Sequence, residues 1–168
     1  MVMAGLLSKL ILKRVVKSAL AFEAQSIAAY RGLRSKAGQG RGGSDTLDAG
    51  LCHLLAEEEL HRKILEDTAA GRLSLPELET LLREHLYSGL ADIRPLDPQS
   101  LALWECELSS ALEHEERTLI FYGNLRRMSR IPAVRKAFEV LGAMEKEHLE
   151  ILRRLMGLAQ SPAKPPFT

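Results

Sequence analysis

The sequence has few cysteines, few aromatic residues and almost no net charge. Its 168 residues include 2 cysteines, 5% aromatic residues and a formal net charge of +1. Cys52 and Cys106 form no Cys-x-x-Cys motif, which argues against a zinc ribbon or another four-cysteine metal site. We expect both to be small buried side chains in a reducing cytoplasm. The balanced charge gives no indication of nucleic acid binding.

A long uninterrupted apolar run is also missing. Residues 1–20 are apolar but contain four basic residues, so we expect neither a membrane-spanning helix nor a signal peptide. At helical spacing these residues form a basic stripe and an apolar stripe: Lys9, Lys13 and Lys17, and Leu7, Ile11 and Val15. Such a helix can rest on a membrane surface, or it can pack on a second copy of the chain. We expect the second arrangement, in a cytoplasmic homodimer.

The apolar residues that are present favour helices, because most of them are leucine, alanine and isoleucine. The length fits one domain over residues 1–160, followed by a disordered proline-rich tail at 161–168. The apolar periodicity predicts four long helices: about 6–33, 44–71, from Pro98 onward, and from Pro132 to about Gly157. The third helix places either Ala111 or Leu112 on its apolar stripe.

Two connections differ in length and composition. Residues 34–44 are rich in glycine and basic residues, which is typical of a flexible linker. Residues 73–98 are longer and contain Ser74-x-x-Glu77, a capping box that predicts a short helix over 75–87. So long a segment leaves room for a crossover that makes the second and third long helices parallel.

The strongest signal is a short motif that occurs twice. Glu58-x-x-His61 aligns without gaps with Glu145-x-x-His148, within a longer match that starts at residues 55 and 142. A glutamate and a histidine three residues apart lie on one helix face, so both can reach one point beside the helix. Leucine follows each pair at helical spacing, which places the pair on the apolar side.

The segments before the two motifs repeat as well. Glu23 matches Glu115, and a tyrosine follows each by seven residues, at Tyr30 and Tyr122. Seven residues are two turns, so each tyrosine shares a face with its glutamate. The chain is therefore a duplicated helix pair.

Burying four glutamates on apolar stripes is unfavourable unless something compensates their charge. An unpaired ionised carboxylate costs several kcal/mol to bury, and no lysine or arginine shares the inward face with any of the four. Two divalent cations would offset four carboxylates. Carboxylates and imidazoles suit iron or manganese better than thiolate-seeking metals. We therefore expect a two-metal site, with these ligands: Glu23, Glu58, His61, Glu115, Glu145 and His148.

The pattern resembles the ferritin-like superfamily, nearest the rubrerythrin-type di-iron carboxylate proteins, over about residues 19–155. The resemblance implies an all-α, ferritin-like four-helix bundle with a long crossover between helices 2 and 3. It also implies that Glu58 and Glu145 each bridge two iron ions. The other ligands would be terminal: Glu23 and Glu115 through oxygen, His61 and His148 through nitrogen.

Two further residues match the family, and one does not. Tyr30 and Tyr122 match tyrosines that hydrogen-bond ligand carboxylates, although tyrosines at helical spacing are also common as core aromatics. Rubrerythrins carry an additional glutamate one turn after the third-helix glutamate, where this chain has Thr118. They also carry a rubredoxin domain that this sequence does not contain. We expect the remaining candidates to be surface or structural: Glu57, Glu59, Glu113, Glu116 and Glu147, and His53, His85 and His114.

Three functions fit these residues. The first is an oxidoreductase that reduces O2 or peroxide at two iron or manganese ions and takes electrons from an external donor. The second is a ferroxidase or iron-handling protein. The third is a helical interaction bundle with a vestigial site. We expect the first.

Overall fold

The computed structural model describes residues 2–39, 44–85 and 93–158, with the backbone alone at 2–12 and at residue 85. Within these residues every regular element is a helix. The helices are α1 (Val2–Gly38), α2 (Asp45–Ala69), α3 (Leu75–His85), α4 (Pro98–Met128) and α5 (Pro132–Leu155). Three parts of the sequence expectations lie outside the described residues: the tail at 161–168, residues 40–43 of the glycine-rich linker, and residues 86–87 of the predicted short helix.

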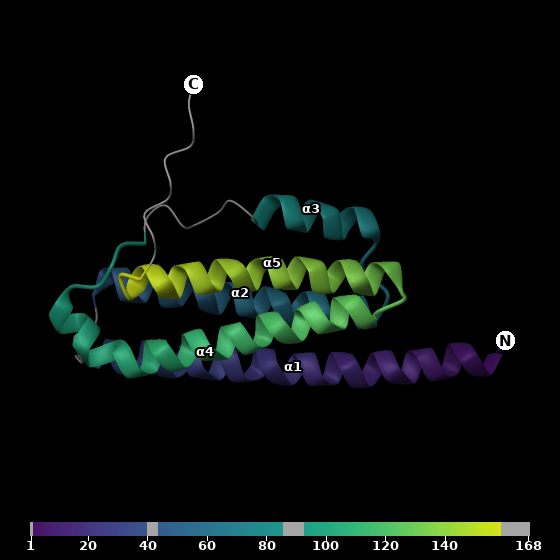
Figure 1. Ribbon diagram of the computed structural model, residues 1–168, viewed down its shortest axis with the longest axis horizontal. Helices are drawn as coiled ribbons and strands as arrows, with labels where there is room; N and C mark the ends of the chain where they lie inside the picture. The colour runs from purple at the N-terminus through teal and green to yellow at the C-terminus, as the bar shows by residue number, and fades with distance from the viewer. Residues whose placement is uncertain (1, 40–43, 86–92, 159–168) are drawn as a thin grey trace, which may run out of the picture.

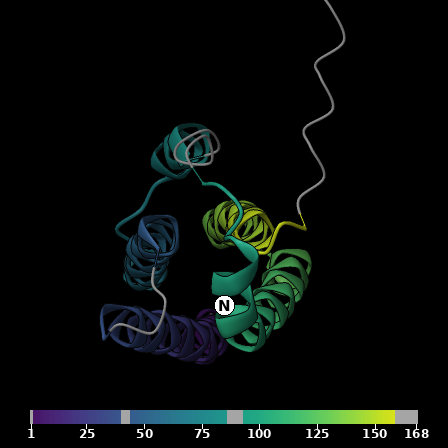
Figure 2. The same ribbon diagram turned by 90° about the vertical axis from the view of Figure 1, so that its left-hand side faces the viewer.

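The four long helices lie side by side, with α3 outside them (Figure 1). Seen end on, α1, α2, α5 and α4 surround a common interior, and α3 packs on α5 and not in that interior (Figure 2). The chain reverses direction between α1 and α2 and again between α4 and α5, while α2 and α4 run the same way. The long connection that contains α3 makes this possible, because it carries the chain back along the outside.

Local sequence signals start the helices where they were predicted. The Ser44 hydroxyl accepts a hydrogen bond from the backbone N–H of Leu47 at 3.2 Å and caps α2. Asp97 caps α4 by accepting from the N–H groups of Gln99 and Ser100, both at 3.0 Å. Side-chain caps satisfy backbone donors that have no partner inside the helix, which fixes the starting residue.

The start of α3 differs in detail from a full capping box. The Glu77 carboxylate accepts from the backbone N–H of Ser74 at 2.8 Å and also from its hydroxyl at 2.6 Å. The carboxylate half of the predicted box is therefore present, while the serine hydroxyl donates and does not accept. Upstream, α2 ends before Gly71, whose φ of 68° favours glycine.

Helix α1 is longer at both ends than the predicted 6–33. Its last turns are held by ion pairs from Arg34 to Asp48 on α2 at 3.0 Å and from Lys36 to Glu107 on α4 at 3.4 Å. Residues 34–37 are also acceptable helix formers, so the glycines further on end the helix later than expected. The N-terminal turns of α1 extend past the ends of the other helices (Figure 1).

Two apolar clusters fill the interior, one toward each end. The first surrounds Trp104 and includes Leu51 and Leu155, and the second surrounds Phe138 and includes Leu65. Tyr30 belongs to the first cluster and Tyr122 to the second. The repeated motifs lie on the helices between these clusters, so apolar side chains shield them from both ends.

Some sequence expectations need correction. Cys52 is only half-buried and Cys106 is exposed, because both lie off the apolar stripes of their helices. The two alternatives for the α4 stripe are resolved: Ala111 is buried and Leu112 is half-buried. Among the described residues, no helix combines the length and the apolar character needed to cross a membrane.

Candidate metal centre

All four long helices contribute to one buried polar cluster. Each of its side chains is at most 1% exposed although the surroundings are apolar. The members are Glu23 on α1, Glu58 and His61 on α2, Glu115 on α4, and Glu145 and His148 on α5. The structure thus brings together every residue that the repeats indicated as a metal ligand.

The first half of the cluster is arranged around the Nδ1 atom of His61. Three carboxylate oxygens from three helices surround this nitrogen: Oε2 of Glu23 at 3.3 Å, Oε1 of Glu145 at 3.3 Å and Oε2 of Glu58 at 3.6 Å.

The second half repeats this arrangement around the Nδ1 atom of His148. Oε1 of Glu58 lies at 3.1 Å, Oε2 of Glu145 at 3.5 Å and Oε2 of Glu115 at 3.9 Å. Glu58 and Glu145 therefore present one oxygen to each histidine, whereas Glu23 and Glu115 each face one histidine only. We call Glu58 and Glu145 the bridging glutamates because each faces both histidines, and Glu23 and Glu115 the terminal glutamates because each faces one.

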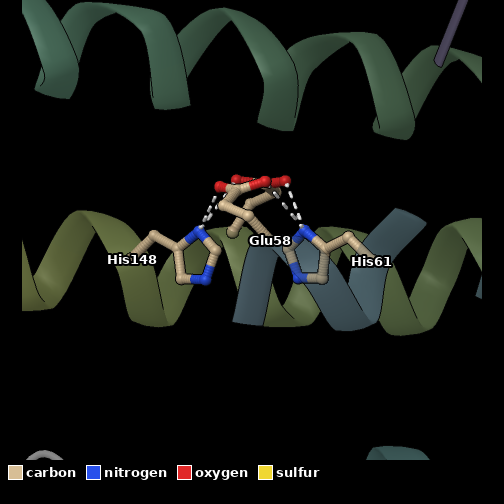
Figure 3. A group of neighbouring side chains, drawn as sticks. Glu58, His61 and His148 are labelled. Carbon is tan, nitrogen blue, oxygen red and sulfur yellow. Dashed lines mark ion pairs between the residues drawn. The ribbon is translucent and has the colours of Figure 1, made fainter. Parts of the chain in front are cut away.

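The two histidines lie close enough for one carboxylate to reach both. Their rings are stacked, with centroids 4.9 Å apart and an angle of 17° between the planes. Figure 3 shows the Glu58 carboxylate on the Nδ1 side of both rings, with an ion pair to each. The interior of the cluster is thus a small volume bounded by oxygen and nitrogen atoms from both repeats.

Each terminal glutamate is also held by a tyrosine. The Tyr30 hydroxyl donates to Oε1 of Glu115 at 2.5 Å, and the Tyr122 hydroxyl donates to Oε1 of Glu23. Both tyrosines are buried. These bonds leave Oε2 of each terminal glutamate facing its histidine, so each carboxylate has one oxygen fixed and one available.

The two bridging carboxylates have low pKa values despite their burial. Burial raises the pKa of Glu145, but its contacts with His148 and His61 outweigh burial and hold the pKa at about 2. For Glu58 the same two histidines outweigh burial and hold the pKa well below its usual value. Both groups are therefore ionised at neutral pH.

The terminal carboxyls and the imidazoles have raised pKa values. Burial raises the pKa of Glu115 to about 8 and the pKa of Glu23 well above its usual value. Burial lowers the pKa of His61 and His148, but the surrounding carboxylates outweigh it and raise both. Without metal, the centre then holds two carboxylates against two imidazoliums. This corrects the expectation of four ionised carboxylates without a cationic partner, because only lysine and arginine were considered as partners.

The donor atoms fit a metal and not a closed hydrogen-bond network. Glu58 and Glu145 have both oxygens, and His61 and His148 both ring nitrogens, buried without a hydrogen-bond partner in the described part of the chain. The ion pairs between the two Nδ1 atoms and these carboxylates, at 3.1–3.6 Å, offset part of the cost of burying these atoms. The two Nε2 atoms have no such ion pair among the described residues, and an unsatisfied buried group costs about 1–3 kcal/mol. One ligand atom from each of these four residues lies within 4.8 Å of the others. The buried cluster can therefore hold a metal ion.

Most residues outside the pattern lie at the surface or near it. Glu113 and Glu116 are exposed, whereas Glu57, Glu59 and Glu147 are half-buried, which is less solvated than expected. His53 is half-buried on α2, and the side chain of His85 lies outside the described residues.

His114 is the functional candidate that sequence reasoning missed. It lines an open groove next to Glu115, and its Nε2 atom is buried without a hydrogen-bond partner among the described residues. The repeat contained the signal, because His114 aligns with Phe22.

Comparison with known proteins adds no assignment, since no family model, curated protein or solved structure matches the chain.

Proposed function

We propose that the protein is a di-iron, or di-manganese, carboxylate oxidoreductase with a ferritin-like four-helix bundle, nearest the rubrerythrin type. In this proposal two metal ions reduce O2 or peroxide with electrons from an external donor. The observation that supports it most is the pair of bridging carboxylates: Glu58 and Glu145 each offer one oxygen to His61 and one to His148.

The donor set favours iron or manganese. Four carboxylates and two imidazoles, with no thiolate, match the preferences of hard to borderline divalent ions. Two such ions would balance four ionised carboxylates, so metal binding replaces the protons that Glu23, Glu115 and the histidines hold in the metal-free site. Bound iron would supply the capacity to exchange electrons with O2 or peroxide.

The protein's own residues position and protect this chemistry. Tyr30 and Tyr122 hold one oxygen of each terminal glutamate, which limits how far the carboxylate can move. The apolar clusters around Trp104 and Phe138 exclude water from both ends of the site. Low local polarity strengthens each charge interaction inside the centre.

Metal analysis combined with turnover separates the three candidate functions. Protein from iron-supplemented growth should contain two iron ions per chain and should oxidise a reduced dye with peroxide or O2 over many turnovers. Iron uptake with oxidation of added Fe(II), but no turnover with a donor, would support the ferroxidase function instead. Buried Thr118 favours that alternative, because rubrerythrins carry a carboxylate at this position. The absence of bound metal would leave only the interaction bundle.

The assembly is a separate part of the proposal. We propose a homodimer that forms through the N-terminal part of α1, since this helix runs past its neighbours. The side chains of Leu7 and Ile11, which suggested the apolar face, lie outside the described residues. Sedimentation velocity should give the mass of a dimer at micromolar concentration. A monomer that binds anionic vesicles would support the membrane-surface alternative.

A further inference from the structure

An open groove leads from the surface to one side of the metal centre. It runs between α1 and α4, has a volume of about 440 Å³, and reaches Glu115 and its tyrosine partner Tyr30. Small residues line part of its walls, including Ala28, Ala29 and Gly32 on α1. α1 and α4 lie next to each other, but these small residues leave the space between them unfilled here.

The other repeat closes the equivalent space with two aromatic rings. Phe22 on α1 and Phe121 on α4 stack there, with centroids 4.7 Å apart. The repeat alignment matches Phe22 with His114 and Phe121 with Ala29. One side of the duplicated site is thus blocked by a phenylalanine pair, whereas on the Glu115 side the corresponding positions hold an imidazole and a methyl group. Between α1 and α4, the described part of the duplicated site is therefore open on the Glu115 side and closed on the Glu23 side.

The groove is much larger than an oxidant requires. A water molecule occupies about 30 Å³ of liquid, and O2 or hydrogen peroxide has only two heavy atoms. A volume of about 440 Å³ is instead within the range of sites for organic molecules. The size therefore argues that the groove accommodates an organic ligand.

The lining indicates the chemistry of that ligand. The walls are mainly apolar, from Leu33 and Ala111 and from the small residues already named. The polar side chains of the lining are Gln25, Ser26, Tyr30, Lys36, Glu107, Ser110, His114, Glu115 and Arg117. Two of the neutral ones lie close to the centre in sequence: His114 precedes Glu115, and Ser26 lies one turn before Tyr30. Both cations of the described lining have acidic partners: Lys36 pairs with Glu107 at 3.4 Å and Arg117 pairs with Glu113 at 3.8 Å. Neither is therefore free to select an anion. Such a lining fits a mainly apolar molecule with one hydrogen-bonding group.

We propose that this groove is the organic substrate site of the protein, and that it binds a small, mainly apolar molecule carrying a hydroxyl or carbonyl group beside Glu115 and Tyr30. Filled from the α1–α4 side, it places the ligand next to the His148 half of the centre and not the His61 half. The role as a substrate site rests on the proposed function, whereas binding in the groove does not require metal.

The repeat supplies the variant that tests this proposal. Ala29→Phe places on α1 the ring that Phe121 provides on α4, so it should stack on His114 and close the groove. Ala24→Phe is the matched control, because Ala24 is an exposed alanine of the same helix that does not line the groove. The probe is 1-naphthol, which is apolar and neutral and carries one hydroxyl. Its affinity is measured by calorimetry on the full chain.

A second pair of variants guards against a folding defect in the first. An added Cβ at Gly32 or Gly123 meets no atom within 4 Å, and only Gly32 lines the groove. Gly32→Leu should therefore weaken 1-naphthol binding and Gly123→Leu should not.

The outcomes separate this inference from the proposed function. We expect the unmodified protein to bind 1-naphthol. Ala29→Phe and Gly32→Leu should weaken this binding by about tenfold or more, and both control variants should stay within about twofold of the unmodified protein. The metal content should be the same in all five proteins. If the chain binds 1-naphthol saturably but takes up no iron or manganese, the proposed function is wrong and the proposed ligand site in the groove is still supported. Two results would contradict the proposed ligand site and leave the proposed metal centre unaffected. One is iron-loaded protein that shows no saturable 1-naphthol binding below about 1 mM. The other is equal weakening of binding by the variants and by their controls.

Discussion

The hydroxyl of Tyr30 on α1 donates a 2.5 Å hydrogen bond to Oε1 of Glu115 on α4, across the interior of the molecule. The second repeat contains the reciprocal bond, from Tyr122 on α4 to Glu23 on α1. Each tyrosine therefore shares its helix with one terminal glutamate and holds the other. The two bonds link α1 and α4 on both sides of the centre and fix the direction of both carboxylates.

Removing one of these hydroxyls should weaken metal binding in one half of the site. Tyr30→Phe leaves Oε1 of Glu115 buried without a donor, so the carboxylate loses its fixed orientation. We expect about 10–100-fold lower affinity for one of two Co(II) ions, measured by optical titration. Tyr122→Phe should have the same effect through Glu23. Two unaffected ions in both variants would show that the tyrosines are only core aromatics.

Neutralising a bridging carboxylate should affect both metals. Glu58→Gln keeps the size of the side chain but removes the charge that faces both His61 and His148. We expect neither Mn(II) nor Fe(II) to bind as a pair, as read from metal content after desalting. The matched control is Glu59→Gln, because Glu59 is half-buried and pairs with Arg31 on the outside of the molecule. Equal losses in the variant and the control would show that the ligand assignment is wrong.

Proton binding predicts how metal-dependent stability changes with pH. Between the usual glutamate pKa of 4.5 and about 8, the native metal-free protein keeps the Glu115 proton that the unfolded chain releases. The native state then binds more protons, so the metal-free protein loses stability as pH rises through this window. The raised pKa values of Glu23, His61 and His148 act in the same direction.

Metal binding has the opposite dependence, because the metal replaces those protons. The difference in melting temperature between Mn(II)-loaded and chelator-treated protein should therefore widen from pH 5 to pH 8. Scanning fluorimetry at several pH values measures it. The low pKa of Glu145 adds no pH dependence in this range, because its stabilisation is complete above the usual glutamate pKa of 4.5 and is lost only as pH falls toward about 2. A difference that is constant or narrows with pH would contradict the proposed protonation of the metal-free site.

Much of the helical architecture could be predicted from the sequence because its signals are local. The Ser44 and Asp97 caps and the 3.6-residue periodicity depend on neighbouring residues alone. The ends of α1 could not be predicted as well. Its last turn depends on ion pairs with Asp48 and Glu107, which are distant in sequence.

The residues of the buried cluster could be predicted for a different reason: the sequence contains the Glu-x-x-His motif twice, in two aligned repeats. Duplication turned a common Glu-x-x-His pair into a specific signal, and the structure brings both copies together. The imidazole–carboxylate balance was missed because it depends on distances within the cluster, such as 3.1 Å from His148 to Glu58. The groove required a comparison of the two repeats in space, where Ala29 and His114 occupy the positions of a phenylalanine pair.

The last prediction concerns the spacing of the two helices that carry the bridging residues. A Cβ added at Gly50 on α2 would lie 3.0 Å from Cδ1 of Leu155 on α5, and Leu155 is fully buried. Gly50→Leu therefore overpacks this contact, and we expect a loss of about 1–3 kcal/mol in the free energy of unfolding. Because Glu58 and Glu145 come from these same two helices, a wider separation should also weaken metal binding.

Gly123→Leu provides the control, because Gly123 is an exposed helical glycine with no atom within 4 Å of an added Cβ. The Gly123→Leu variant should leave metal binding unchanged. It should raise the free energy of unfolding by about 0.5–1 kcal/mol, since glycine is unfavourable in a helix interior. Urea denaturation of the metal-free proteins measures the stability, and Mn(II) titration measures binding. Gly50→Leu as stable as Gly123→Leu would mean that α2 and α5 are not in close contact at this point. Destabilisation with unchanged metal affinity would instead mean that the spacing at Gly50 is not transmitted to the centre.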